Sequence, residues 1–317
     1  MYFENYRHSV NSLLVYKVLR ENGIPDEHII LAMSEYHACE SRNSYPGEII
    51  LSENNNITER CQNNIDIDYK ESDVHNFAIL DILRGRKLNQ FNNFRQLKTN
   101  KNSRILIVIT SHGGENFIKV RNYQVILSDE LHRTLSEMYI KQLYKELVFV
   151  LDTCEAYSVY DHVNVPNIYF VASSLINQKA SSYSYDDALM GPSVDKFHFL
   201  LFKTLKYIHQ NMLYNYTLDE LFYELKNKKD FLGTDMEINN RITHRKDLML
   251  TEFFGDKRIK DEKTIELNFD IEGFQNVNDR FMIQFLDNNL RLSLTKEDLD
   301  EEIMEMRNYH EEKYEIK

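Results

Sequence analysis

Residues 105–114 read ILIVITSHGG, a continuous apolar run that ends in a polar turn. Such a run is typical of a strand that helices cover on both faces. A second stretch, residues 147–156, reads LVFVLDTCEA and has the same character. The sequence therefore predicts two buried strands that each run into a reactive side chain, His112 in the first and Cys154 in the second.

Helix-period patterns and turn signals surround these two strands. Helices are predicted for the segment with Val10, Leu13, Leu14 and Val18 that ends at Gly23, for Ser72 to Gly85, from Ser128, and for the segment from Val194 to Leu205. Further strands are predicted at 28–33 and 168–172, with a hairpin over 117–127. Alternating strands and helices indicate an α/β fold whose mostly parallel sheet lies between layers of helices.

Composition limits the class of function. The 317 residues carry a formal net charge of −12, which argues against nucleic acid as a partner because such binding needs clustered Lys and Arg. No apolar run is long enough to span a membrane, and no signal-peptide segment is visible. Cys39, Cys61 and Cys154 form no Cys-x-x-Cys pair, so neither a disulfide framework nor a zinc site is expected.

The chemistry lies at the ends of the two strands. If the strands are parallel neighbours, His112 and Cys154 face each other above one edge of the sheet. A catalytic cysteine needs a nearby imidazole or a helix N-terminus to favour the thiolate, and Gly113 and Gly114 allow backbone N–H groups to approach an oxyanion. Either residue alone is more often a buried structural cysteine or a loop histidine. Together they favour acyl transfer.

Three aspartates are hard oxygen ligands of the kind that calcium prefers. They are Asp26, Asp66 and Asp68, and the last two point to one side if the backbone is extended. Taken alone, this pattern is more typical of a solvated acidic loop.

At Ser111-His112-Gly113-Gly114 and Asp152-Thr153-Cys154, the sequence resembles the family of glycosylphosphatidylinositol (GPI) transamidase catalytic subunits, within the legumain-like cysteine peptidases. Further matching segments are Asn5 to His8, Gly23 to Asp26, Ala38 to Asn43, Asp68-Tyr69, Ala172 to Ser174, and Asp247 through Phe253-Phe254-Gly255. The resemblance covers the chain to about residue 258. Asp-Thr-Cys in place of legumain's Glu-Ala-Cys favours the transamidase branch.

The resemblance implies a caspase-like three-layer sandwich over 1–258. Beyond it, charged segments such as Lys257 to Lys263 and Glu297 to Lys317 predict an appended helical tail over 259–317. The resemblance also implies roles for single residues. These are Cys154 and His112 as the catalytic pair, Asn5 as the residue that orients the histidine, Gly113 as oxyanion donor, Ser173 and Ser174 in the substrate pocket, Asp26, Asp66 and Asp68 as ligands of a structural calcium ion, and Cys39 as a candidate for a disulfide to a partner subunit.

The implied reaction removes a C-terminal signal peptide through a thioester and joins the new carboxyl to the ethanolamine amine of a GPI lipid, without a catalytic cofactor. The implied partners are other subunits of a membrane-embedded complex, which would hold the chain at the lumenal face of the endoplasmic reticulum. The family's first strand and secretory signal are expected before Asn5 but are not seen. Two alternatives stay open: a legumain-like endopeptidase, in which water resolves the thioester, and a non-catalytic scaffold of the same fold.

Overall fold

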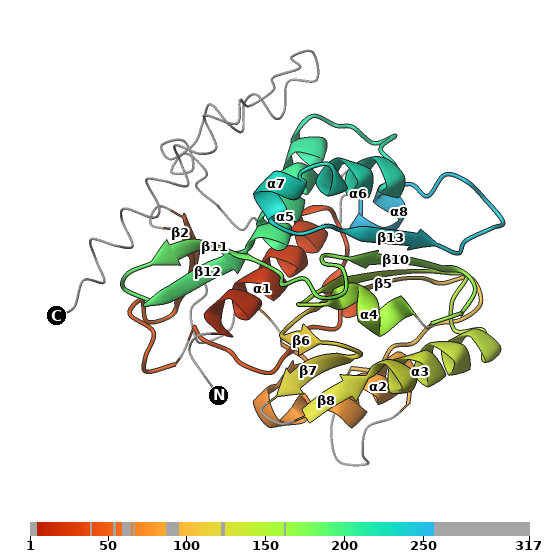
Figure 1. The fold of residues 1–317 in the computed structure, drawn as a ribbon, viewed down its shortest axis with the longest axis horizontal. Helices are drawn as coiled ribbons and strands as arrows, with labels where there is room; N and C mark the ends of the chain where they lie inside the picture. Colours follow the sequence, from red (N-terminus) through yellow and green to blue (C-terminus); the bar gives the residue numbers. More distant parts are fainter. Residues whose placement is uncertain are drawn as a thin grey trace. The chain divides into compact units, whose positions relative to one another are not determined.

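A four-stranded sheet in the order β13-β10-β9-β5 forms the centre of the computed structural model (Figure 1). The parallel strands are β5 (Arg104–Thr110), β9 (Glu146–Asp152) and β10 (Ile168–Ala172), and β13 (Glu237–Asn240) pairs antiparallel with β10. Every residue of β9 and β10 is buried, as expected for parallel strands that are covered on both faces. The predicted α/β class and mostly parallel sheet are confirmed.

The structure describes residues 5–38, 40–52, 55–58, 65, 67–86, 95–121, 124–161 and 163–256. These residues belong to one unit, Met1–Asp270. A second unit, Ile271–Lys317, lies outside the described residues. The tail predicted for 259–317 lies there too, and the predicted domain boundary at residue 258 stays a prediction.

Helices cover both faces of the central sheet (Figure 1). One layer contains α1 (Tyr6–Glu21), α5 (Lys196–Gln210), α6 (Leu218–Lys226) and the short α7 (Lys229–Leu232). The other contains α2 (Asn76–Leu83), α3 (Ser128–Ile140) and α4 (Ala156–Asp161). Successive side chains of β10 point to opposite helix layers. The ring of Phe170 stacks on that of Tyr160 in α4, with centroids 3.8 Å apart, whereas the ring of Tyr169 packs against that of Phe222 in α6, with centroids 6.0 Å apart.

Smaller sheets and short helices complete the described elements. The sheets pair β1 (Ala32–Met33) with β4 (Tyr69–Lys70), β2 (Glu48–Ser52) with β3 (Asn55–Thr58), β11 (Ser182–Asp186) with β12 (Gly191–Asp195), and β6 (Gly113–Gly114) with β7 (Phe117–Arg121) and then β8 (Gln124–Leu127). Short helical elements are the 3₁₀ turns Asp26–His28 and Glu71–Asp73 and the helix α8 (Thr251–Phe254). The β7–β8 pair confirms the hairpin predicted for residues 117–127.

Several predicted elements differ in extent, each for a local reason. The strand predicted at 28–33 shrinks to β1, since a 3₁₀ turn over Asp26–His28 takes its first residue and the carbonyl of Ile29 accepts from Arg95 and not from a neighbouring strand. The helix predicted from Ser72 begins at Asn76, where the His75 side chain caps the backbone N–H of Ala78. The helix predicted from Val194 begins at Lys196, because Val194 is paired with Tyr183 in the β11–β12 hairpin.

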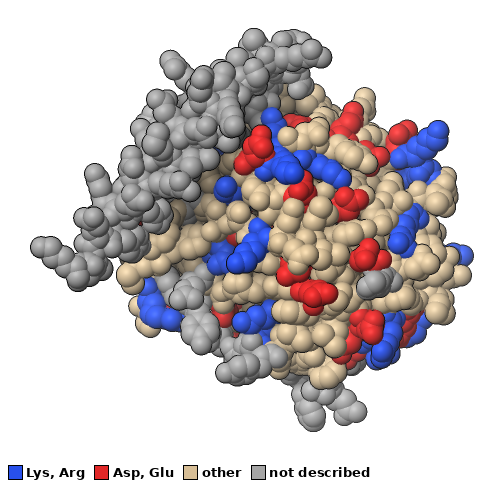
Figure 2. Space-filling model, in the orientation of Figure 1, with Lys and Arg blue, Asp and Glu red and all other residues tan. Residues whose placement is uncertain are grey.

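Two surface properties bear on function. Within the described ranges, no helix combines the length and the apolar character needed to cross a bilayer. On the face presented in Figure 2, acidic and basic side chains are interspersed.

Candidate active site

The ends of β5 and β9 place the two reactive side chains at one edge of the sheet. The strands pair in register from Arg104↔Glu146 to Thr110↔Asp152, and the backbone N–H of Ser111 donates to the carbonyl of Asp152 at 3.1 Å. His112 and Cys154 follow these paired residues at the same spacing. Both side chains are partly exposed, and Cys154 is a free thiol. The fold thus brings the predicted nucleophile and base to the same end of neighbouring parallel strands.

Asn5 makes the contact that an orienting residue needs. Its Oδ1 lies 2.7 Å from Nε2 of His112, across 107 positions of sequence. A carbonyl oxygen can only accept, so Nε2 carries the proton and Nδ1 keeps a lone pair. This tautomer leaves His112 able to act as a base through Nδ1. Asn5 is positioned by α1, which begins at the next residue.

The glycine loop (residues 113–116) lies directly against the nucleophile turn (residues 153–155). A Cβ added to Gly113 would stand 2.3 Å from Oγ1 of Thr153 and 3.0 Å from the carbonyl of Phe117. Any other residue would push the two segments apart. This close approach explains the glycine at position 113, and its role as oxyanion donor stays a prediction.

Ser174 holds the nucleophile turn in place through hydrogen bonds. Its Oγ donates to the carbonyl of Thr153 at 2.7 Å and accepts from the N–H of Ala156 at 3.1 Å, while its own carbonyl accepts from Tyr157. Ser173 and Ser174 are 2% and 0% exposed. Both side chains are buried, and their predicted role in the substrate pocket stays a prediction.

The environment of His112 favours its neutral form. Burial lowers the pKa of the imidazole to about 4, and the charges of Arg7 and Lys119 add to the effect. The ring of His8 stands edge-on to that of His112, with centroids 5.0 Å apart, and burial holds the pKa of His8 well below its usual value. The candidate base is therefore unprotonated at neutral pH.

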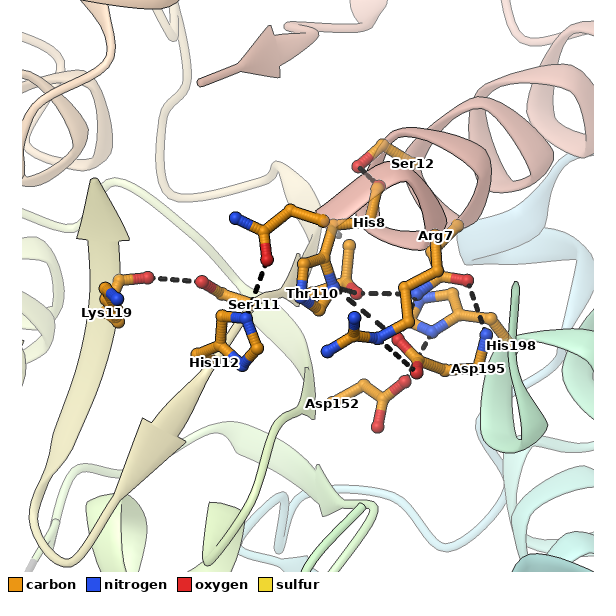
Figure 3. Close-up of polar contacts among 12 residues, drawn as sticks. Arg7, His8, Ser12, Thr110, Ser111, His112, Lys119, Asp152, Asp195 and His198 are labelled. Atoms are coloured by element: carbon orange, nitrogen blue, oxygen red, sulfur yellow. Dashed lines mark hydrogen bonds and ion pairs between the residues drawn. The ribbon is translucent and has the colours of Figure 1, made fainter. Parts of the chain in front are cut away.

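A buried charged cluster behind His112 was not predicted from the sequence (Figure 3). Asp152 accepts from Nδ1 of His198 at 2.7 Å, and Asp195 accepts from Nε of Arg7 at 3.0 Å and from Asn11 at 2.6 Å. Burial and the charge of Asp152 raise the pKa of Asp195 to about 6. The cluster joins α1, α5 and the end of β9 immediately before the nucleophile turn.

The sequence contained a signal for part of this cluster. Arg7 and Asp152 lie inside the motifs that define the resemblance, although no role was assigned to them. Asp195 and His198 belong to no such motif, and their positions became apparent only from the hairpin that ends at Asp195.

The described carboxylates of the predicted calcium site are already paired with an arginine. Arg95 lies 3.0 Å from Oδ2 of Asp26 through Nη2 and 3.1 Å from Oδ1 of Asp68 through Nε. Its Nη1 donates to the carbonyls of Asp26 and Ile29, both at 2.7 Å. The guanidinium thus neutralises the repulsion that suggested a metal ion. Asp66 lies outside the described residues, within which no cluster of ligands for a metal is found; calcium stays a prediction.

Cys39, the candidate for a disulfide to a partner, also lies outside the described residues, and so does Cys61.

Comparison with known proteins identifies relatives over most of the chain. Residues 1–256 match the model of the peptidase C13 family. The GPI-anchor transamidase of Saccharomyces cerevisiae is 30% identical over 253 residues, which cover 79% of this chain and 60% of the yeast protein. A putative GPI-anchor transamidase of Drosophila melanogaster is 32% identical over 79% of this chain and 70% of its own length. The human GPI-anchor transamidase is 29% identical, over 97% of this chain and 74% of the human protein.

The lowered pKa of His112 can be measured directly. In a histidine-selective NMR titration, its imidazole should gain a proton with a midpoint near pH 4, well below the usual 6.5. His112→Gln would assign the signal by deleting it. Lys119→Met should raise the midpoint, because a neighbouring positive charge that opposes protonation is removed. A midpoint near 6.5 in the folded protein would show that His112 is solvated instead.

The role of Arg95 can be tested through stability. Arg95→Met would leave Asp26 and Asp68 without their shared cation, so the free energy of unfolding, measured in urea, should fall by about 2 kcal/mol, less than for a fully buried pair. Added calcium should recover part of this loss by mass action. Arg86→Met is the matched control, since Arg86 bridges Asp81 and Glu137 on the surface, and its loss should change the free energy of unfolding much less. Equal losses in the two variants would contradict a special role for Arg95.

Proposed function

The chain belongs to the peptidase C13 family, and we propose that it is the catalytic subunit of a GPI-anchor transamidase. One observation carries the proposal: Cys154 and His112 follow the paired ends of β5 and β9, with Asn5 bonded to the imidazole. A thiol beside an oriented imidazole is what a thioester-forming enzyme needs. The names of the yeast and human relatives supply the reaction.

The first half-reaction forms a thioester on Cys154. The sulfur attacks the carbonyl carbon of the peptide bond that precedes a C-terminal signal, and Nδ1 of His112 accepts the thiol proton. The oxyanion is stabilised by the backbone N–H of Gly113. The C–N bond then breaks, and His112 returns the proton to the leaving nitrogen. The signal peptide departs with a free amino group, and the proprotein stays attached to the sulfur.

The second half-reaction transfers the acyl group to an amine. The ethanolamine nitrogen of a GPI lipid attacks the thioester carbonyl, and His112 accepts a proton from that nitrogen. The C–S bond breaks, and the sulfur of Cys154 regains a proton. One amide bond has been exchanged for another without a change in oxidation state, so the proposed mechanism uses no catalytic cofactor.

The proposal extends to partners and location. The proprotein signal and the GPI lipid are the substrates, and further subunits of a membrane complex would tether the chain at the lumenal face of the endoplasmic reticulum. Cys39 is proposed as the residue that links the chain to such a subunit through a disulfide. The most direct test is affinity purification from native membranes, where co-purifying membrane-spanning proteins are expected.

The alternative is a legumain-like hydrolase, which would use the same pair with water as the acceptor. The family description as peptidases is compatible with it. In a transferase, the thioester must survive until an amine arrives, although water is far more concentrated. The nature of the product therefore decides between the two functions.

Transfer to a small amine tests the proposal. Membranes that contain the chain, supplied with a proprotein substrate and hydroxylamine, should release the signal peptide and yield the hydroxamate of the new C-terminus. Cys154→Ala and His112→Ala should lower this yield by at least about 100-fold, because the nucleophile or its base is lost. The hydroxamate is measured by mass spectrometry.

His132→Ala is the matched control, since it removes an imidazole from α3 and should retain full activity. All three variants should have far-ultraviolet circular dichroism close to that of the unmodified chain. Release of free acids alone at high hydroxylamine would make the chain a hydrolase. Full activity in Cys154→Ala would refute both readings.

A further inference from the structure

Two backbone turns with positive φ meet beside α4. Asn116 in the glycine loop has φ 64°, and Glu155 in the nucleophile turn has φ 53°. Asparagine adopts the left-handed region more readily than most residues, whereas it is unfavourable for Glu155, so the nucleophile turn persists only where its surroundings hold it. The contacts around these two residues therefore show what fixes the two segments in place.

One hydroxyl group bonds to both turns. Oγ of Ser158, on α4, donates to the carbonyl of Glu155 at 2.7 Å and accepts from the backbone N–H of Asn116 at 2.9 Å. The carbonyl of Gly114 lies 3.4 Å from the same oxygen. Ser158 is 2% exposed, so water does not compete readily for these bonds. The carbonyl of Glu155 also accepts from the backbone N–H of Ser158 at 2.9 Å, so loss of the hydroxyl would chiefly deprive the N–H of Asn116 of its bond to α4.

The two segments that Ser158 joins carry different parts of the proposed machinery. The glycine loop begins with Gly113, the proposed oxyanion donor, and follows directly on His112. The nucleophile turn contains Cys154. Gly113 and Thr153 are in contact on one side, at the spacing that excludes a Cβ. On the α4 side, Ser158 links the glycine loop to the nucleophile turn through hydrogen bonds. The contact at Gly113 limits how closely the two segments can approach, and the bonds of Ser158 limit how far they can separate.

We propose that Ser158 is a positioning residue, which fixes the separation between the glycine loop and the nucleophile turn and thereby aligns the oxyanion donor with the thioester-forming carbonyl. This inference rests on the proposed thioester chemistry at Cys154 but not on the identity of the acceptor. Ser158 is not proposed to contact the substrate; it acts only by holding the two backbone turns in place.

The position of Ser158 predicts which step it affects. Ionisation of Cys154 depends chiefly on His112 and on groups near the sulfur, whereas the described bonds of the Ser158 hydroxyl go to the backbone of Glu155, Asn116 and Gly114. Alignment of the oxyanion donor matters only once a carbonyl carbon is attacked, and a displacement of about 1 Å can cost about 100-fold in rate. Loss of the hydroxyl should therefore slow acylation while leaving the reactivity of the thiol unchanged.

Ser158→Ala tests this in the membrane-bound chain. The rate of signal-peptide release at saturating substrate should fall by about 10- to 100-fold, with KM within about 2-fold. Alkylation of Cys154 by iodoacetamide should keep its rate within about 2-fold, because this reagent needs the thiolate but no oxyanion donor. Signal release is followed with and without hydroxylamine, so the measurement is valid for a transferase and for a hydrolase.

Ser128→Ala is the matched control. Ser128, on α3, is also a buried serine, and its Oγ donates at 2.7 Å to the carbonyl of Val159 in α4, the helix that carries Ser158. Its backbone N–H, which the substitution retains, donates to Asn116. The variant should lose a similar amount of stability while keeping its rate of signal release.

Each outcome bears on one claim. A slowed Ser158→Ala with normal alkylation and a normal Ser128→Ala supports positioning. An unchanged rate in Ser158→Ala, an equal loss in Ser128→Ala, or a parallel loss of alkylation overturns it. If the wild-type chain releases the signal but forms only free acid, the proposed transferase function is refuted. The comparison of the two serine variants would still test the positioning role of Ser158.

Discussion

The register between β5 and β9 is the constraint on which the rest of the site depends. Every residue of β9 is buried, while β5 is the end strand of the described sheet and is buried only at Ile105 and Ile107. A peptide group of β9 that lost its partner would be costly, so the pairing from Arg104↔Glu146 to Thr110↔Asp152 cannot slip freely. A slip of one residue would also turn the apolar side chains of a strand to the opposite layer of helices. Because the register is fixed, His112 and Cys154 follow the two strands at the same level of the sheet.

A second constraint acts from beneath the strand ends. Asp152 and Asp195 are two buried carboxylates near one arginine, Arg7. Burial first, and then the charge of Asp152, raises the pKa of Asp195. If one charged side chain of this cluster were removed, the opposite charge would stay buried without a partner. The loss of stability would be far larger than for breaking an ion pair on the surface. The cluster therefore holds α1 and α5 to the end of β9. It gives the segment before Cys154 a rigid base, while the turn itself adopts an unfavourable backbone conformation at Glu155.

The features predictable from the sequence were those with a short repeating signal. The runs at 105–109 and 147–151 predicted buried strands, and their polar ends predicted where His112 and Cys154 would lie. Asn5 could be assigned only through the resemblance, since no periodicity links it to a histidine 107 positions away. Ser173 and Ser174 were predicted to lie in the substrate pocket, and both are buried, with Ser174 bonded to the nucleophile turn. Their burial depends on tertiary packing, which a local sequence pattern does not predict.

The missed features share a physical cause. Ser158 differs in nothing from any other serine on a helix until the two backbone turns on either side of it are known. Arg95 lies outside every apolar pattern, yet it joins Asp26 and Asp68. Hydrogen-bond and charge complementarity between distant segments leaves no trace in spacing along the chain.

The hydrogen bond between Asn5 and His112 has a consequence for biosynthesis. It joins residues 107 positions apart, and the ion pair between Arg7 and Asp195 spans 188. Contacts of such high sequence separation form late, after the entropy of closing long loops has been overcome. During translation, α1 is made before the other described helices and strands but cannot complete its contacts until residue 195 has followed. The orientation of His112 and the anchoring of α1 are therefore completed only after the whole parallel sheet has been synthesised.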